Sequence, residues 1–338
     1  MRGIVLLGDG ELAVKEFPDP IPGRGEVVVR TKVAAICGSD IHMLHFPKKH
    51  YEGRPERVAG HEPAGVVEAV GDGVTTVRPG DRVSVYHYIG CGKCKQCLAG
   101  FRQWCPETKG LGAHVHGADA DFVLVKEDNC FVLPDQLSFI DGAFMACVAG
   151  TSYSALSKLQ PNGTTSLAVL GLGPVGLSGV VMAKAMGAQV VAIGKRQVRL
   201  DLARELGADY ILDANDPETP NAFRSLFPMG IDMVYETSGA PESQSYMLQI
   251  LRRGGKACIV AGTGAQDGPG TSAIVGKQLT IHGSFVLPIW MVGEMAAFIV
   301  SHGLPFEKMV THRFTLDQAE EAFRLFDSGE CGKVVFEW

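Results

Sequence analysis

Four cysteines share one short segment of the chain and give its clearest chemical signal. Their spacing is Cys91-X2-Cys94-X2-Cys97-X7-Cys105, with glycines between them that let the backbone wrap. Four thiolates bind zinc tetrahedrally in a closed site, which stabilises a fold and leaves no position for a substrate. An iron–sulfur cluster or disulfide bridges are the alternatives, but iron–sulfur spacing normally differs and a reducing cytosol opposes disulfides. The segment therefore predicts a structural zinc.

A second set of metal-binding side chains lies in two separate segments. Cys37-Gly-Ser-Asp-Ile-His42 and Gly60-His61-Glu62 offer a thiolate, imidazoles and carboxylates. A catalytic zinc uses three protein ligands and keeps one position open. Each segment alone has an ordinary explanation, because an isolated cysteine is usually a buried apolar residue and His61 could be a core histidine. The combination favours a catalytic metal.

A glycine-rich turn indicates a dinucleotide. Gly171-Leu-Gly173-Pro174-Val175-Gly176 follows an apolar run and precedes a helical stretch. The first glycine permits the turn, the second lets the backbone approach a pyrophosphate, and the third lets the helix pack on the strand. A tight turn without a ligand is the alternative.

The end of the next predicted strand bears on the choice of nicotinamide cofactor. An NAD-selective site usually carries Asp or Glu there for the ribose 2'-hydroxyl. Here Gly194 leaves room for a 2'-phosphate, and Lys195, Arg196 and Arg199 could pair with it. NADP(H) is therefore preferred over NAD(H), although the same cations could form a solvated helix start.

The secondary-structure elements expected to position these residues differ between the two parts of the chain. Residues 1 to about 145 contain short runs of Val, Gly and Pro, such as 26–33 and 65–70, which predict a β-rich domain. Later, strands alternate with helices at 166–170, 174–186, 189–193 and 198–206, with further strands at 231–235, 256–261 and 279–284. This pattern predicts an α/β fold with a six-stranded, doubly wound parallel sheet. Thr315 to Gln318 predicts a capping box, Gly329 a helix end, and 332–338 a last strand.

Bulk properties narrow the function classes. The chain has 338 residues, a net charge of -6 and a 46% hydrophobic content, which favours two folded domains and opposes binding to nucleic acid. No signal peptide is indicated, and two apolar stretches, 167–183 and 284–300, are shorter than a spanning helix. We expect a cytoplasmic protein that binds small molecules and not membranes.

Taken together, these four motifs in this order resemble the medium-chain, zinc-dependent alcohol and polyol dehydrogenases over essentially the whole chain. The resemblance implies a GroES-like catalytic domain at 1–148 with a zinc lobe at about 88–108. It further implies a Rossmann domain at 149–288 and a segment, 289–338, that returns to the catalytic domain. Two zinc ions per chain and a tetramer, or else a dimer, are also implied.

The resemblance assigns roles residue by residue. It makes Cys37, His61 and Cys147 zinc ligands, with Glu62 as an alternate ligand. It gives Asp40 the task of fixing the tautomer of His61, and Ser39 and His42 that of relaying the alcohol proton to solvent. It places Thr237, Gly262 and Lys333 at the cofactor.

The expected reaction is hydride transfer between a nicotinamide and a secondary alcohol, polyol or sugar-derived alcohol, with zinc lowering the pKa of the alcohol. An amino-alcohol dehydrogenase of the threonine type is the second reading, from which the chain departs by having Cys147 where that group carries an acid. A zinc-ribbon module that binds nucleic acid or a partner is the third, and the acidic net charge opposes it.

Overall fold

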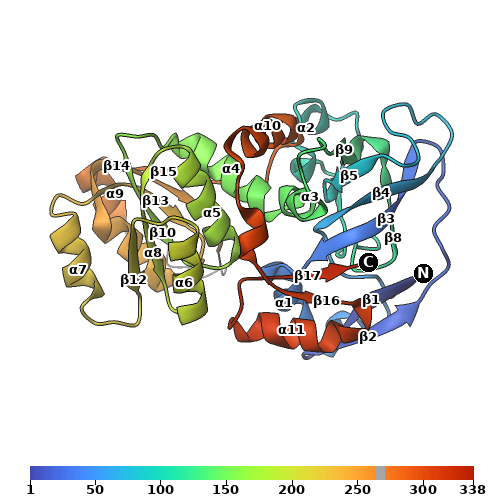
Figure 1. Ribbon diagram of the computed structural model, residues 1–338, viewed down its shortest axis with the longest axis horizontal. Helices are drawn as coiled ribbons and strands as arrows, with labels where there is room; N and C mark the ends of the chain where they lie inside the picture. Colours follow the sequence, from blue (N-terminus) through green and yellow to red (C-terminus); the bar gives the residue numbers. More distant parts are fainter. Residues whose placement is uncertain (263–270) are drawn as a thin grey trace. The chain divides into compact units, whose positions relative to one another are not determined.

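The computed structural model describes residues 1–262 and 271–338, which fall into two compact units (Figure 1). Unit 1 comprises Met1–Cys147, Pro288–Ser301 and Val310–Trp338, and unit 2 comprises Val148–Leu287 and His302–Met309. The last segment differs from the expectation that all of 289–338 returns to the first domain. The 3-10 helix η5 (Phe306–Met309) contacts α5 (Pro174–Ala185) in unit 2, and its Phe306 and Met309 are fully buried.

Unit 1 is built on a sheet of seven strands among the described residues, in the order β16, β17, β3, β4, β5, β9, with β8 pairing with β3. These strands are β3 (Glu26–Ala35), β4 (Pro63–Val70), β5 (Arg82–Val85), β8 (Phe122–Lys126), β9 (Cys130–Val132), β16 (Val310–Phe314) and β17 (Lys333–Glu337). Alternate valines of β3, β4, β5 and β8 pack into one apolar cluster. Strand β17, from the end of the chain, pairs antiparallel with β3, with Val335 opposite Ala35.

Helices and a hairpin cover this sheet. Helix α3 (Phe139–Ala146) packs on β3, β4 and β5. A second core joins β1 (Arg2–Gly8), β2 (Glu11–Glu16), α1 (Gly38–Leu44) and α11 (Ala319–Ser328). The Thr315 and Gln318 capping box precedes α11, and Gly329 ends it with φ of 74°. Helix α10 (Val292–His302) follows the 3-10 helix η4 (Ile289–Met291), and η1 (Lys48–His50) and η3 (Glu127–Asn129) are single turns.

Unit 2 holds a six-stranded parallel sheet in the order β12, β11, β10, β13, β14, β15, which confirms the predicted fold class. The strands are β10 (Ser166–Leu170), β11 (Gln189–Gly194), β12 (Tyr210–Asp213), β13 (Ile231–Glu236), β14 (Leu251–Ile259) and β15 (Thr280–Gly283). Sequence reasoning missed β12, a half-buried edge strand whose apolar run, Tyr210 to Leu212, is only three residues long between Asp209 and Asp213.

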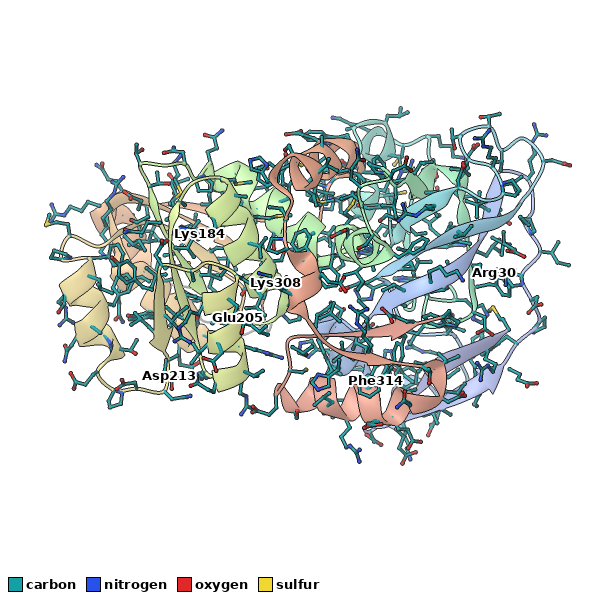
Figure 2. The ribbon with its side chains drawn as sticks, viewed as in Figure 1. Arg30, Lys184, Glu205, Asp213, Lys308 and Phe314 are labelled. Carbon is teal, nitrogen blue, oxygen red and sulfur yellow. The ribbon has the colours of Figure 1, made fainter. Side chains whose placement is uncertain are left out.

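Helices flank both faces of the parallel sheet. Apolar residues of α7 (Thr219–Leu226), α8 (Pro241–Ile250) and α9 (Thr271–Lys277) join the strands in one core. Helix α4 (Val148–Leu159) contacts α5, α5 contacts α6 (Gln197–Glu205), and all three helices pack on strands of the sheet. Figure 2 shows Lys184 on α5 and Glu205 on α6. No single helix among the described residues is long and apolar enough to cross a membrane, and α3 with α4 reaches that length only across a bend.

Candidate functional site

Four potential metal donors converge in unit 1. One donor atom from each of Cys37, His61, Glu62 and Cys147 lies within 4.8 Å of the others. Each residue stands at the end of an element. Cys37 caps the start of α1, His61 and Glu62 immediately precede β4, and Cys147 caps the end of α3. Chain segments more than 80 residues apart thus meet at the ends of the sheet and its covering helix.

Asp40 orients the imidazole of this cluster. Its carboxylate is buried, and the Oδ1 atom lies 3.2 Å from Nδ1 of His61. The Oδ2 atom accepts a hydrogen bond of 2.8 Å from the backbone N–H of Cys37. A carboxylate on the far nitrogen fixes the ring tautomer and leaves Nε2 for a metal. Ser39 Oγ lies 3.5 Å from that Nε2 and is exposed, and His42 is exposed on the last turn of α1.

The electrostatics of the cluster fit a divalent cation. Contact with Cys147 holds the pKa of Cys37 well below its usual range, and contact with Cys37 raises that of Cys147. Burial lowers the pKa of His61, but the attraction of Asp40 and Cys37 for the imidazolium raises it by more. The pKa of His61 therefore lies well above its usual value. Two thiols, an imidazole and buried carboxylates so close together carry excess negative charge once ionised. A dication with soft ligand preferences would neutralise it.

Glu62 and Lys333 form a fully buried ion pair beside the cluster. Lys333 Nζ lies 2.7 Å from Glu62 Oε2 and donates a hydrogen bond of 2.7 Å to the Ile36 carbonyl. Burial raises the pKa of Glu62 to about 8 even though Lys333 opposes the shift. The resemblance had placed Lys333 at the cofactor. The structure pairs its ammonium with Glu62 in unit 1, and contact with a cofactor stays a prediction.

His87 is a buried side chain of the cluster that sequence reasoning missed. It follows β5, and its Nδ1 lies 2.7 Å from the carbonyl oxygen of Ala146, the residue before Cys147. Its ring centroid is 5.2 Å from that of His61. Burial lowers the pKa of His87 to about 3, so the ring is neutral and Nδ1–H donates to the carbonyl. A lone histidine immediately before the zinc lobe gave no spacing signal that could have identified it.

Asp119 is the second missed residue. Its carboxyl is fully buried, and neither oxygen has a hydrogen-bond partner in the described part of the chain. A Cβ at Gly60, which has φ of +83°, would lie only 2.1 Å from Asp119 Oδ1, so this glycine is required beside His61. Burial raises the pKa of Asp119 well above its usual value. Burial thus favours the protonated form of this acid, which lies against the backbone of Gly60.

We expect Asp119→Asn to stabilise the protein increasingly as pH rises. An acid with a raised folded-state pKa contributes stability below its unfolded pKa of about 4 and loses it as pH rises through the folded value. The melting temperature of Asp119→Asn should therefore exceed that of wild type by a few degrees more at pH 8 than at pH 5. Thermal melts at fixed zinc concentration measure this, with exposed Asp317→Asn as control. A difference that shrinks with pH would contradict the assignment.

The four-cysteine segment forms a second convergent cluster in unit 1. One sulfur from each of Cys91, Cys94, Cys97 and Cys105 lies within 4.8 Å of the others, and all nine cysteines are free thiols. The segment contains α2 (Lys95–Leu98) and η2 (Arg102–Trp104), and it is flanked by the paired strands β6 (Tyr88–Ile89) and β7 (Lys109–Gly110). Backbone N–H groups point at the sulfurs, with Cys97 N 3.5 Å from Cys94 Sγ and Cys91 N 3.4 Å from Cys105 Sγ. Such donors stabilise thiolates, which are the zinc-binding form.

The glycine-rich turn of unit 2 has the geometry expected of a phosphate-binding turn. Gly171 has φ of +88°, and nothing lies within 4 Å of a Cβ built at Gly173, so the backbone there is open to a ligand. A Cβ at Gly176 would lie 1.9 Å from the Gly171 carbonyl oxygen, which shows why the third position must be glycine. Pro174 and Val175 open α5, whose N-terminus favours an anion.

A cavity of about 680 Å³ in unit 2 runs from this turn to the ends of β11 and β12. The predicted cofactor residues that line it are Gly171, Gly173, Gly194, Lys195, Arg196, Arg199 and Thr237. Thr237 Oγ1 donates to the Leu170 and Gly171 carbonyls at 3.0 and 2.7 Å and so also braces the turn. Gly262 is not among the lining residues, and a Cβ built at Gly239 would lie 3.1 Å from the backbone nitrogen of Gly262.

Gly194 is glycine because it packs closely against Leu172, which differs from the expected reason. We expected it to leave room for a 2'-phosphate. A Cβ there would lie 2.8 Å from Leu172 Cδ1, so a side chain of the glycine-rich turn already occupies that direction. The neighbouring loop after β12 adds Asn215, whose Nδ2 donates to the Lys195 carbonyl at 2.9 Å, and Asp216 to the cavity wall. Lys195, Arg196 and Arg199 remain on the same wall.

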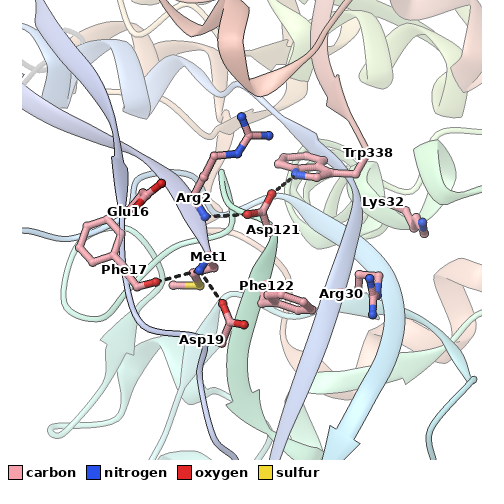
Figure 3. A pocket seen from close by; sticks show the side chains of 10 residues that line it. All are labelled: Met1, Arg2, Glu16, Phe17, Asp19, Arg30, Lys32, Asp121, Phe122 and Trp338. Carbon is pink, nitrogen blue, oxygen red and sulfur yellow. Dashed lines mark hydrogen bonds and ion pairs between the residues drawn. The ribbon is translucent and has the colours of Figure 1, made fainter.

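Another hollow, of about 610 Å³, opens at the edge of unit 1 where β1, β3 and the C-terminal residue meet (Figure 3). Several of its charged groups are paired with neighbouring residues of the hollow. Asp121 accepts hydrogen bonds from Arg2 N at 2.6 Å and Trp338 Nε1 at 3.0 Å, and the ammonium of Met1 pairs with Asp19 at 2.5 Å. This hollow lacks the metal donors and the glycine-rich turn, so we place the chemistry elsewhere.

Comparisons with known proteins identify the family of the chain. The family described as an alcohol dehydrogenase GroES-like domain matches residues 23–135, and the one described as a zinc-binding dehydrogenase matches residues 174–301. The chain is 32% identical to the uncharacterized zinc-type alcohol dehydrogenase-like protein YphC of Escherichia coli K12, over 99% of this chain and 98% of that protein. It is also 32% identical to the L-threonine 3-dehydrogenase of Francisella tularensis, over 96% and 95%.

Solved structures give the same result. The alcohol dehydrogenase TADH from Thermus sp. ATN1 superposes with a TM-score of 0.91 and 31% identity, covering 100% of this chain and 99% of that one. Among the other structural matches, one was determined with NADH and one with NADP. Both nicotinamide cofactors therefore occur among proteins of this fold.

Proposed function

Because the chain belongs to the zinc-dependent medium-chain alcohol dehydrogenases, we propose that it interconverts a secondary alcohol, polyol or sugar-derived alcohol with its ketone, using NADP(H) in preference to NAD(H). The family supplies the coarser part of this statement, namely an oxidoreductase with zinc and a nicotinamide cofactor. The single observation that carries the proposal is the convergence of Cys37, His61, Glu62 and Cys147 donors within 4.8 Å.

The proposed metal ligands are Cys37, His61 and Cys147, with Glu62 as the alternate ligand. A zinc ion held there would supply Lewis acidity that lowers the pKa of a bound alcohol, and an oxidised nicotinamide would supply the acceptor for the hydride of the alcohol carbon. Asp40 holds the His61 ring in the binding tautomer. The position of Ser39, 3.5 Å from His61 Nε2 and exposed, supports its role as the first proton acceptor. The exposure of His42 on the same helix supports proton delivery to solvent.

The cofactor preference is proposed from charge on the cavity wall. Lys195, Arg196 and Arg199 line the cavity of unit 2 near the end of β11, where an NAD-selective site would carry an acid. A 2'-phosphate can accept charge-assisted hydrogen bonds from such cations. Gly171, Gly173 and the start of α5 would bind the pyrophosphate, and Thr237 and Gly262 would contact the cofactor further along the sheet.

Initial rates with a panel of polyols, secondary alcohols and ketones, measured with NADP(H) and NAD(H) side by side, test this proposal. We expect turnover of at least one secondary alcohol and higher kcat/KM with NADP(H). Equal or better values with NAD(H) would overturn the cofactor preference. Turnover by protein that contains no zinc would overturn the proposed metal centre.

An amino-alcohol substrate is the second candidate, because the Francisella L-threonine 3-dehydrogenase matches 96% of this chain. Cys147 stands where that group carries an acid, which favours the first candidate. Including L-threonine in the same panel separates the two, since the first candidate predicts a kcat/KM for threonine well below that for the best polyol. We also propose that the protein is a homo-oligomer, a tetramer or else a dimer. Size-exclusion chromatography with light scattering would measure its molar mass.

The second zinc is proposed for the four-cysteine lobe, and Cys97→Ser tests it. Removing one of four thiolates from a closed zinc site removes folding free energy. We expect the variant to lose one of two zinc ions per chain and its melting temperature to fall by more than about 10 °C. Lys95→Ala, an exposed change on the same short helix, is the matched control. A melting temperature equal to that of the control would rule out a structural metal there.

A further inference from the structure

Lys333 is a lysine with no solvent exposure, placed behind the donor cluster of unit 1. Its Nζ donates to the Ile36 carbonyl and lies 2.7 Å from Glu62 Oε2. The rings of Phe144 and Phe326 each lie with their centroids 5.9 Å from the ammonium. A buried ammonium costs several kcal/mol unless it is paired, so these contacts fix its position closely.

These contacts join three parts of the chain that the cluster needs. Ile36 immediately precedes Cys37, and Glu62 immediately follows His61. Lys333 begins β17, which pairs with β3 through Val335 and Ala35. The ammonium therefore ties both ligand-bearing segments to a strand from the other end of the sequence, and its charge is the nearest cation recorded for the Glu62 carboxylate.

Glu62 is placed to compete for a metal. One of its oxygens lies within 4.8 Å of the donors of Cys37, His61 and Cys147. Neither oxygen makes a well-directed hydrogen bond to any described residue, so the ion pair with Lys333 is the main restraint recorded for it. A buried carboxylate released from its counterion would gain most by binding an adjacent dication.

We propose that Lys333 is a positioning residue that holds Glu62 beside the catalytic zinc and off it, so that the fourth coordination position stays open to substrate. This inference rests on the proposed zinc centre. Without the Lys333 charge, Glu62 would take the open position, and any other ligand would have to displace it. A lysine that served only the fold would alter stability and leave access to the metal unchanged.

Imidazole binding to cobalt-substituted protein tests the proposal without turnover. Cobalt(II) binds the same kinds of donor as zinc and absorbs visible light, and its spectrum changes when an added ligand enters an open position or displaces a ligand already bound. Imidazole is neutral at the pH of the titration, about 8.5, so loss of the lysine charge has little direct effect on it. We expect Lys333→Met to weaken the apparent Kd at least about tenfold, which corresponds to about 1.4 kcal/mol.

The double variant Glu62→Gln with Lys333→Met is the decisive comparison. It removes the competing carboxylate, so imidazole affinity should return to within about threefold of Glu62→Gln alone. It also replaces a buried ion pair with neutral groups of similar volume, which proteins tolerate well. Unchanged imidazole affinity in Lys333→Met, or no recovery in the double variant, would overturn the inference.

Two further variants keep the test sharp. Lys333→Arg retains the charge and should bind imidazole within about threefold of wild type. If Lys333→Met does not fold, Lys333→Gln, which keeps a hydrogen-bond donor near Ile36, should weaken imidazole at least about threefold. Cobalt content is measured for each protein. Wild-type protein that retained cobalt in the four-cysteine lobe alone would contradict the metal centre itself, whereas full loading with unaltered imidazole affinity contradicts only the role of Lys333.

Discussion

Cys37→Ser should lower kcat/KM by at least about a thousandfold, or about 4 kcal/mol of transition-state stabilisation, while the protein stays folded. Cys37 supplies one sulfur of the donor cluster and, through its backbone N–H, a hydrogen bond of 2.8 Å to Asp40. A serine hydroxyl is a poor substitute for a thiolate toward zinc. We therefore expect zinc content to fall from about two ions per chain to about one. Metal analysis, far-UV circular dichroism and initial rates measure the three consequences.

The matched control is Cys130→Ser. Cys130 begins β9 in the same unit, is half-buried like Cys37, and lies outside both cysteine clusters. It should retain two zinc ions and activity close to wild type. If Cys37→Ser kept its activity and both zinc ions, the catalytic centre would have to be assigned to other residues. If it lost activity but kept both ions, Cys37 would act in another way than as a ligand.

Replacing Lys195 and Arg196 together by alanine should raise the KM for NADP(H) roughly 10- to 100-fold and change that for NAD(H) by less than about threefold. Each cation that binds a phosphate through a charge-assisted hydrogen bond contributes about 1.5–3 kcal/mol, and partial exposure reduces this. NAD(H) lacks the 2'-phosphate and so loses little. The ratio of kcat/KM for the two cofactors, measured with one substrate, gives the result directly.

Arg204→Ala is the control for that experiment. Arg204 lies on α6, the helix that follows Arg196, but pairs with Asp201 at 2.7 Å and does not line the cavity. Its replacement should leave the cofactor ratio unchanged. Equal losses with both cofactors in the double alanine variant would mean that the two cations serve the turn after β11 and do not select the phosphate.

Local spacing let the sequence determine several features of this protein. The four-cysteine lobe and the turn from Gly171 to Gly176 were predicted because each is complete within one short segment, where spacing alone fixes geometry. The predicted bounds of β10, residues 166–170, agree with the structure, because a short apolar run that ends at a glycine-rich turn favours a buried strand. Edge strand β12 was missed because its apolar run is only three residues long, Tyr210 to Leu212, and is flanked by aspartates.

Only the tertiary structure brought the long-range groups together. Cys37, His61 and Cys147 are separated by up to 110 positions, and before the structure only the family resemblance added Cys147 to the other two. The pairing of Glu62 with Lys333, the bond from His87 to Ala146, the buried Asp119 beside Gly60 and the packing of Leu172 on Gly194 had no signature in the sequence. Spacing along a chain specifies contacts within one turn or loop. Contacts between distant segments depend on how sheets and helices pack, which no short pattern encodes.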